Sequence, residues 1–165
     1  MEQLLLLLKN YMPIPVVLFF IGGGILFLFL YDWNPVSRKL KSSPAIPQNE
    51  FLENWDEYRK NDTSGCYVIT IYRRKPLRST VNKTKRYNDV YVGQSVNIHK
   101  RVFNHLTGHG NGDVYADVKY GRHVYVKFVP CPAEQLNKYE KWLINHFDAT
   151  TSYNRTKGGA KVTAR

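Results

Sequence analysis

An uninterrupted run of 19 uncharged residues, residues 12–30, constrains this chain more strongly than any other feature. As a helix with a rise of about 1.5 Å per residue, it would span roughly 28 Å, which is close to the hydrocarbon thickness of a bilayer. Tyr31 and Trp33 follow it, where interfacial aromatic residues are common. We therefore predict a short N-terminal tail over residues 1–11 and a transmembrane helix over residues 12–31.

Basic residues stand mainly on the C-terminal side of this run, at Arg38, Lys39 and Lys41, whereas Lys9 stands alone before it. By the positive-inside rule, the protein is expected to be a single-pass membrane protein whose C-terminal domain is cytoplasmic. Two other interpretations stay open. A cleaved signal peptide would need a more basic start and a small-residue cleavage site, and a buried core helix would have to accommodate the glycines at residues 22–24.

The positive charge of the chain lies after residue 60. The first 60 residues carry six basic and six acidic side chains, so the whole excess of +11 belongs to residues 61–165. A small domain this basic usually faces a polyanion, because each neutralised phosphate releases counterions. Nucleic acid is therefore the expected partner, with membrane headgroups or a merely soluble basic surface as the alternatives.

Residues 61–165 alternate between the patterns of strands and helices. Runs of β-branched and aromatic residues predict strands, and apolar residues at helical spacing predict helices. The predicted elements follow the order β-β-α-β-α, at residues 66–73, 89–93, 96–106, 123–129 and 132–147. This order predicts an α/β fold of the α+β kind, a small sandwich with a three-stranded antiparallel sheet.

Residues 32–60 are interpreted as a linker that ends in a short amphipathic helix. The first part is rich in Pro, Ser and Lys, and Phe51, Leu52, Trp55 and Tyr58 then recur at helical spacing. This apolar face packs either on the domain or in the headgroup layer of the membrane, and the sequence does not decide between them.

Glu140 is the carboxylate whose position is hardest to reconcile with a solvated surface. It lies within a helical stripe whose other members are all apolar, namely Leu136, Tyr139, Leu143, Ile144 and Phe147. A carboxylate at such a position needs a cation, because desolvating it alone is costly. The two explanations are a structural salt bridge and a metal ligand in a cleft. Arg101 and His105, one turn apart on the preceding helix, would face the same cleft.

Several short motifs follow one another within residues 65–159. They are GCY at 65–67, YVG at 91–93, GQSVNI at 93–98 followed by Arg101 and His105, EKWLI at 140–144, YN at 153–154, and NRTKGG at 154–159. Together, and in this order, they resemble the GIY-YIG endonuclease family, in particular its phage-type and homing members with an NxTxGG ending. The resemblance covers the whole predicted domain.

The resemblance implies hydrolysis of phosphodiester bonds in DNA with the help of one divalent cation, Mg²⁺ or Mn²⁺. It assigns the metal to Glu140, the role of general base for the attacking water to Tyr67, and a hydrogen bond within the site to Tyr91. Arg101 would stabilise the charge of the phosphorane-like transition state. Tyr67 then needs nearby positive charge, because a phenol with a pKa of about 10 is a poor base. Without the motifs, both tyrosines would be interpreted as core residues of strands.

Three further residues have supporting roles in the resemblance. His105 would assist near the nucleophile or the leaving group, and Asn154 would fix the local backbone. Gly93 would support the site, or it simply ends its strand.

A basic loop between the first two predicted strands is the expected nucleic-acid-binding element. Between residues 73 and 86 it holds seven basic and no acidic side chains, namely Arg73, Arg74, Lys75, Arg78, Lys83, Lys85 and Arg86. We interpret this loop as a contact to the phosphate backbone beside the site. A solvated flap is the alternative.

The sequence thus favours a membrane-anchored, metal-dependent endonuclease that acts on DNA entering the cell. Few residues follow Asn154, so site specificity would be low or supplied by a protein partner. The main alternative is a non-catalytic, membrane-tethered nucleic-acid-binding module on the same fold. A structural membrane protein with a basic, lipid-facing domain is the third interpretation.

Overall fold

The computed structural model describes the chain at residues 17–21, 24–28, 34–77, 81 and 86–154. The chain forms two compact units, residues 1–38 and residues 39–165. All the predicted site residues belong to the second unit.

In the first unit, Val17–Ile21 (β1) and Gly24–Leu28 (β2) pair as antiparallel strands, with Ile21 opposite Gly24. This corrects the prediction of one continuous helix over residues 12–31. The other residues of that range, 12–16, 22–23 and 29–31, lie outside the described residues. Val, Ile and Phe favour strands and glycine is a poor helix former, so two strands on either side of the glycine run satisfy the local preferences. Within the described residues, no helix is long and apolar enough to cross a membrane.

The second unit is built on a four-stranded antiparallel sheet in the order β3-β6-β4-β5. The long strands are β4 (Gly65–Tyr72), β5 (Asp89–Ser95) and β6 (His123–Pro130), which correspond to the three predicted strands. The fourth strand, β3 (Ile46–Pro47), comes from the predicted linker and pairs with β6. The prediction of a three-stranded sheet is therefore one strand short, because a two-residue strand leaves no periodic signal in the sequence.

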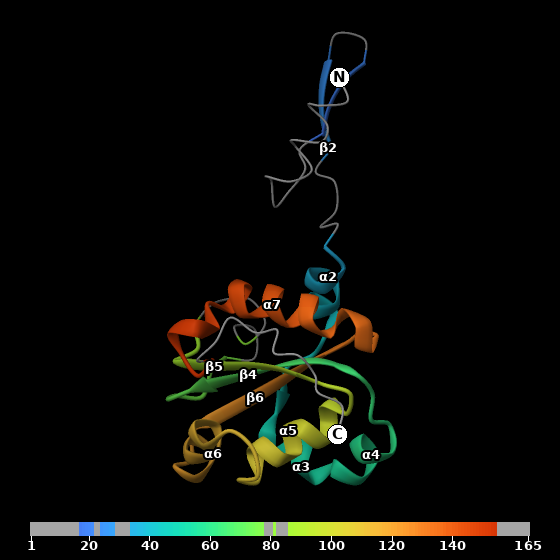
Figure 1. Cartoon of the computed structure of the whole chain (residues 1–165). Helices are drawn as coiled ribbons and strands as arrows, with labels where there is room; N and C mark the ends of the chain where they lie inside the picture. The colour runs from blue at the N-terminus through green and yellow to red at the C-terminus, as the bar shows by residue number, and fades with distance from the viewer. Residues whose placement is uncertain (1–16, 22–23, 29–33, 78–80, 82–85, 155–165) are drawn as a thin grey trace. The chain divides into compact units, whose positions relative to one another are not determined.

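Helices cover both faces of this sheet, as Figure 1 shows. α7 (Leu136–Phe147) lies on one face, and the other face carries α3 (Gln48–Glu53), α4 (Trp55–Lys60), α5 (Ile98–Leu106) and α6 (Gly112–Lys119). The remaining helical segments are α2 (Pro35–Ser42), η1 (Ala133–Gln135) and η2 (Ala149–Thr151). α5 and α7 are the two helices predicted for the domain, whereas α6 lies where no regular element was predicted.

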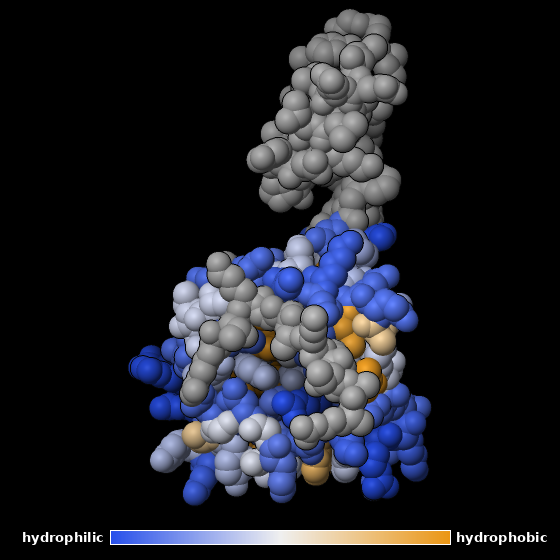
Figure 2. Space-filling model, in the orientation of Figure 1, coloured by the Kyte–Doolittle hydropathy of each residue, from blue (hydrophilic) through white to orange (hydrophobic). Residues whose placement is uncertain are grey.

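The two faces of the sheet bury different sets of side chains. Under α7, four of the five apolar residues of the predicted stripe are buried, Leu136, Tyr139, Leu143 and Ile144, whereas Phe147 is partly buried. On the other face, one hydrophobic cluster joins strands and helices through residues such as Phe51, Ile69, Val102, Val114 and Phe128. The described surface of this unit that Figure 2 shows is mostly hydrophilic, with small hydrophobic patches.

The predicted amphipathic segment packs on the sheet. Phe51 is fully buried, and its ring lies 5.6 Å from that of Phe128 and 4.8 Å from that of Tyr58, measured between centroids. Trp55 stacks on Phe103 of α5 at a centroid distance of 4.2 Å. These contacts decide between the two environments that the sequence left open. The compact unit consequently begins well before the predicted boundary at residue 61.

Phe51→Ala should lower the free energy of unfolding by about 3–5 kcal/mol, because it removes a fully buried ring from the core. Denaturant unfolding followed by circular dichroism measures the loss. Val96→Ala is a suitable control, since Val96 is 55% exposed and its truncation should change the stability by about 0.5 kcal/mol or less. Equal effects of the two substitutions would contradict the packing of α3 on the sheet.

Candidate active site

Two tyrosines and a histidine meet beside the edge strand β5. Tyr67 comes from β4, Tyr91 from β5 and His105 from α5. The Tyr67 hydroxyl oxygen lies 2.8 Å from His105 Nε2, and the ring centroid of Tyr91 lies 6.3 Å from that of Tyr67 and 5.0 Å from that of His105. Tyr67 and His105 are buried, whereas Tyr91 is partly buried. Three of the predicted site residues therefore lie together on the α5 side of the sheet.

Gly93 allows the Tyr67 side chain to occupy this position. The two residues are paired in the antiparallel register of β4 and β5. A Cβ atom at residue 93 would stand 2.2 Å from the Tyr67 hydroxyl oxygen and 2.5 Å from Cζ of its ring. Both distances are far shorter than a van der Waals contact. β5 continues to Ser95, so Gly93 does not end the strand, and the lack of a side chain is what the tyrosine requires.

His105 is held at both of its ring nitrogens. The backbone N–H of Asn111 donates to Nδ1 at 2.6 Å, and Nε2 faces Tyr67. Burial, and then the charge of Arg101, lowers the pKa of His105 to about 4, so the imidazole is neutral at pH 7. The resemblance placed His105 near the nucleophile or the leaving group, but the structure places it behind Tyr67 with 0% of its surface exposed. It can reach a reacting group only through the tyrosine hydroxyl.

Arg101 borders the same cluster from the exposed surface of α5. Burial is the largest influence on Tyr67 and Tyr91, and it raises the pKa of both hydroxyls above the usual value of 10.0. The charge of Arg101 and a hydrogen bond from it lower both pKa values. Arg101 thus acts in the direction that a tyrosine base requires, but it does not offset the burial.

Glu140 approaches the tyrosines from α7, on the opposite face of the sheet from α5. Only 9% of its surface is exposed, which confirms the inward position that the helical stripe predicted. Its negative charge adds to burial in raising the pKa of Tyr67 and Tyr91. The carboxylate therefore lies within electrostatic reach of both hydroxyls.

Gln94 is a site residue that the motifs did not indicate. Its Nε2 donates to Glu140 Oε2 at 3.0 Å and to Asn137 Oδ1 at 2.8 Å. Its Oε1 is buried and accepts no hydrogen bond from the described residues. The available sequence signal was its place directly after Gly93. Through these contacts, a neutral amide orients the carboxylate of Glu140.

Asn154 ties the end of the described chain to β5. Its Oδ1 accepts from the Val92 N–H at 2.8 Å, and its Nδ2 donates to the Val92 carbonyl at 2.7 Å. The N–H of Tyr153 donates to the carbonyl of Val90 at 3.2 Å. The strand that carries Tyr91 is thus paired on its outer side, and Asn154 acts on the backbone, which is the kind of role that the resemblance implied.

The described part of the basic loop is open to solvent. Its exposed basic residues are Arg73, Arg74, Lys75 and Arg86. The other three predicted contacts lie outside the described residues, namely Arg78, Lys83 and Lys85. The exposed groups are accessible to a phosphate backbone, which is the part of a nucleic acid that such side chains usually contact.

A divalent cation would find one carboxylate at this site. Among the described residues, no three His, Cys, Asp or Glu side chains come together as a metal site. Mg²⁺ usually binds through one or two carboxylates and keeps several waters and substrate oxygens as its other ligands. Glu140, whose carboxylate is oriented by Gln94, fits a cation of that kind. It does not fit a metal that requires several protein ligands.

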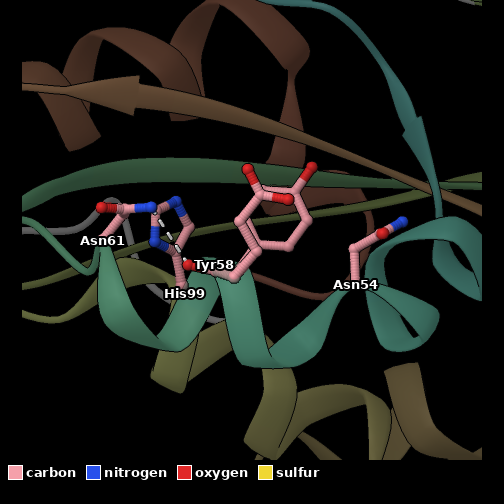
Figure 3. Close-up of a pocket in the computed structure, with 5 residues that line it drawn as sticks. Asn54, Tyr58, Asn61 and His99 are labelled. Carbon is pink, nitrogen blue, oxygen red and sulfur yellow. Dashed lines mark hydrogen bonds between the residues drawn. The ribbon is translucent and has the colours of Figure 1, made fainter.

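A separate pocket of about 380 Å³ lies between α4 and α5, as Figure 3 shows. It is lined by Asn54, Glu57, Tyr58, Asn61 and His99, none of which is a predicted site residue. His99 forms a hydrogen bond with the backbone of Tyr58, and its Nδ1 lies 3.5 Å from Asp62. We attribute this pocket to the packing of the two helices.

Comparisons with known proteins identify no relative. No protein-family model matches the chain, and neither a curated protein nor a solved structure is significantly similar to it. The functional interpretation therefore rests on the residues of the site, on their geometry and on the resemblance of the motifs.

The stability of the protein should depend on pH through His105. Its pKa is about 4 in the folded chain against an ordinary value of 6.5. Between these values the unfolded state binds more protons, so stability is complete above pH 6.5 and falls as the pH drops towards 4. The loss should reach about 3 kcal/mol, and denaturant unfolding at pH 7 and pH 4.5 measures most of it.

His105→Gln is the matched variant, because glutamine does not titrate in this range. Its loss of stability between the two pH values should be smaller by roughly 2 kcal/mol. Burial also lowers the pKa of His99, but His99 is present in both proteins and its contribution cancels. The same pH dependence in both proteins would contradict a buried, neutral His105.

Proposed function

We propose that residues 39–165 form a metal-dependent endonuclease that hydrolyses phosphodiester bonds of DNA. One observation carries this proposal. Tyr67, Tyr91, Arg101 and Glu140 come from four different elements, and the charges of Arg101 and Glu140 both act on the pKa of the two tyrosine hydroxyls. These are the residues to which the GIY-YIG-like motifs assign the chemistry.

The charged residues at the border of the site would act on the phosphate. Arg101 is exposed, so its planar guanidinium can donate two parallel hydrogen bonds to phosphate oxygens as charge develops on them. Glu140 would hold the cation, with Gln94 fixing the direction of its carboxylate. A Mg²⁺ or Mn²⁺ ion bound there would neutralise charge on the phosphate and on the leaving oxygen.

Tyr67 would accept a proton from the attacking water in its phenolate form. The Nε2 of His105, at 2.8 Å, and Arg101 are the groups beside that oxygen that favour the phenolate. Burial opposes ionisation, so Tyr67 depends on the positive charges around it. The exposed arginines and lysine of the basic loop would hold the DNA backbone next to these residues.

A second candidate function is a non-catalytic nucleic-acid-binding module on the same fold. The burial of Tyr67, which has 1% of its surface exposed, favours it, because a general base has to reach the attacking water. In this alternative, Tyr67 and His105 stabilise the core, and the basic surface binds nucleic acid without cleaving it. A cleavage assay separates the two functions.

Glu140→Gln should abolish cleavage and leave binding to a short DNA duplex within a few-fold, because it removes the metal ligand and keeps the shape of the side chain. The melting temperature should be unchanged or higher. Nicking of a supercoiled plasmid by the full chain, with Mg²⁺ or with EDTA, measures the activity. Glu134→Gln is the control, since Glu134 is exposed and lies near the start of the same helix. Full cleavage by Glu140→Gln would exclude this role, and no cleavage by the wild type would favour the binding module.

The second part of our proposal is that residues 12–31 attach the nuclease to a membrane, with the domain in the cytoplasm. It is supported by the uncharged, largely apolar composition of this run and by the basic residues that follow it. Attachment would confine the enzyme to DNA near the bilayer, such as DNA entering the cell, with a protein partner as a source of targeting. Alkaline carbonate extraction of cell membranes should leave the full chain in the membrane fraction and release a variant that lacks residues 1–33. Release of both proteins would refute the attachment.

A further inference from the structure

Asn111 uses two different groups to hold two neighbouring elements. Its side-chain Oδ1 accepts from the N–H groups of Asp113 and Val114, at 2.9 and 3.1 Å, and so caps the start of α6. Its backbone N–H donates to Nδ1 of His105 at 2.6 Å. The loop between α5 and α6 is therefore held against the ring that contacts Tyr67.

Gly110 allows the loop to come this close. A Cβ atom on Gly110 would stand 2.4 Å from Nδ1 of His105 and 2.9 Å from its Cα. Since the Cα belongs to the backbone of α5, a change of side-chain rotamer could not relieve both contacts. The N–H of His109 donates to the carbonyl of Asn104 at 2.8 Å and anchors the loop to the end of the helix.

The N–H of Asn111 determines which nitrogen of His105 carries the proton. A neutral imidazole has one N–H group and one acceptor nitrogen, and a hydrogen bond at one nitrogen fixes the state of the other. A backbone N–H can only donate, so Nδ1 is the acceptor and the ring proton lies on Nε2. His105 consequently donates to the hydroxyl oxygen of Tyr67 across the 2.8 Å contact.

We propose that Gly110 and Asn111 are positioning residues that hold His105 in its Nε2–H tautomer and so direct the hydroxyl proton of Tyr67 away from His105, towards the hydroxyl oxygen of Tyr91. Because Nε2 already carries a proton, His105 cannot accept the one from Tyr67. It donates to the phenolate oxygen, and so stabilises it, after that proton has left past Tyr91, which is only partly buried. The effect on catalysis rests on the proposed nuclease function, whereas the tautomer does not.

The tautomer can be observed directly by NMR. The full chain, labelled with ¹⁵N-histidine and held in detergent micelles at pH 7, gives long-range proton–nitrogen correlations that show which ring nitrogen is protonated. His105→Gln assigns the signals. The wild type should show the Nε2–H form. An Nδ1–H form, or a doubly protonated ring at this pH, would overturn the proposal.

Asn111→Pro and Asn111→Ala form a matched pair of variants. Residue 111 has φ −74° and ψ 122°, a conformation that proline adopts. Both variants lose the side-chain cap of α6, but only the proline variant loses the N–H. The alanine variant should keep the Nε2–H tautomer, and the proline variant should lose it. Gly110→Ala, which displaces the loop, should also lose the Nε2–H tautomer. It serves as the test if the proline variant does not fold. A wild-type tautomer in the folded proline or Gly110→Ala variants would show that the loop does not hold His105.

Plasmid cleavage distinguishes this inference from the proposed function. The proline variant should cleave more slowly than the alanine variant by roughly tenfold or more. The reason is that Tyr67 loses the Nε2–H donor of His105, which stabilises its phenolate form. Equal rates in spite of a changed tautomer would overturn the positioning role. The expected tautomers in proteins that do not cleave DNA would support the tautomer assignment and refute the nuclease.

Discussion

The close approach of the Tyr67 side chain to the backbone of Gly93 determines how the other groups of the site can meet. The register of β4 and β5 pairs the two residues. A Cβ atom on residue 93 would lie only 2.2 Å from the Tyr67 hydroxyl oxygen, so this position excludes a side chain. The hydroxyl oxygen contacts His105 of α5 and lies within electrostatic reach of Glu140 of α7. Tyr67 can take this position because the edge strand carries no side chain at residue 93.

The site separates neutral groups from charged ones. Burial raises the pKa of Tyr67 and lowers that of His105, and both shifts favour the uncharged form. Arg101 is exposed at the border of this neutral pair, and the carboxylate of Glu140, oriented by Gln94, acts on Tyr67 through its charge. A negatively charged substrate that approached the site from solvent would therefore meet the Arg101 guanidinium first. It would also be attracted by the net positive charge of residues 61–165. This arrangement suits a phosphate better than a neutral substrate.

The segment before residue 61 shows how an amphipathic pattern obtains its meaning from a partner. The sequence predicts one short helix with Phe51, Trp55 and Tyr58 on its apolar face, which either lipid or protein could cover. The structure divides it at Asn54, with Phe51 in α3 and the other two residues in α4. In the folded unit, aromatic rings of the sheet and of α5 cover it. Ile46 then reaches β6 as part of an additional edge strand. A stretch with the composition of a linker is thereby part of the domain.

The features that depend on local periodicity could be predicted from the sequence. These are the three long strands, the helices α5 and α7, the inward position of Glu140 and the order of the motifs. The folded chain was needed to find the strand β3, the helix α6, the contact of Gln94 with Glu140 and the position of His105 behind Tyr67. Each of these depends on pairs of residues far apart in the sequence, or on a capping contact too short to produce a period. Periodicity shows which face of an element is buried, but it does not show which residue of another element meets that face.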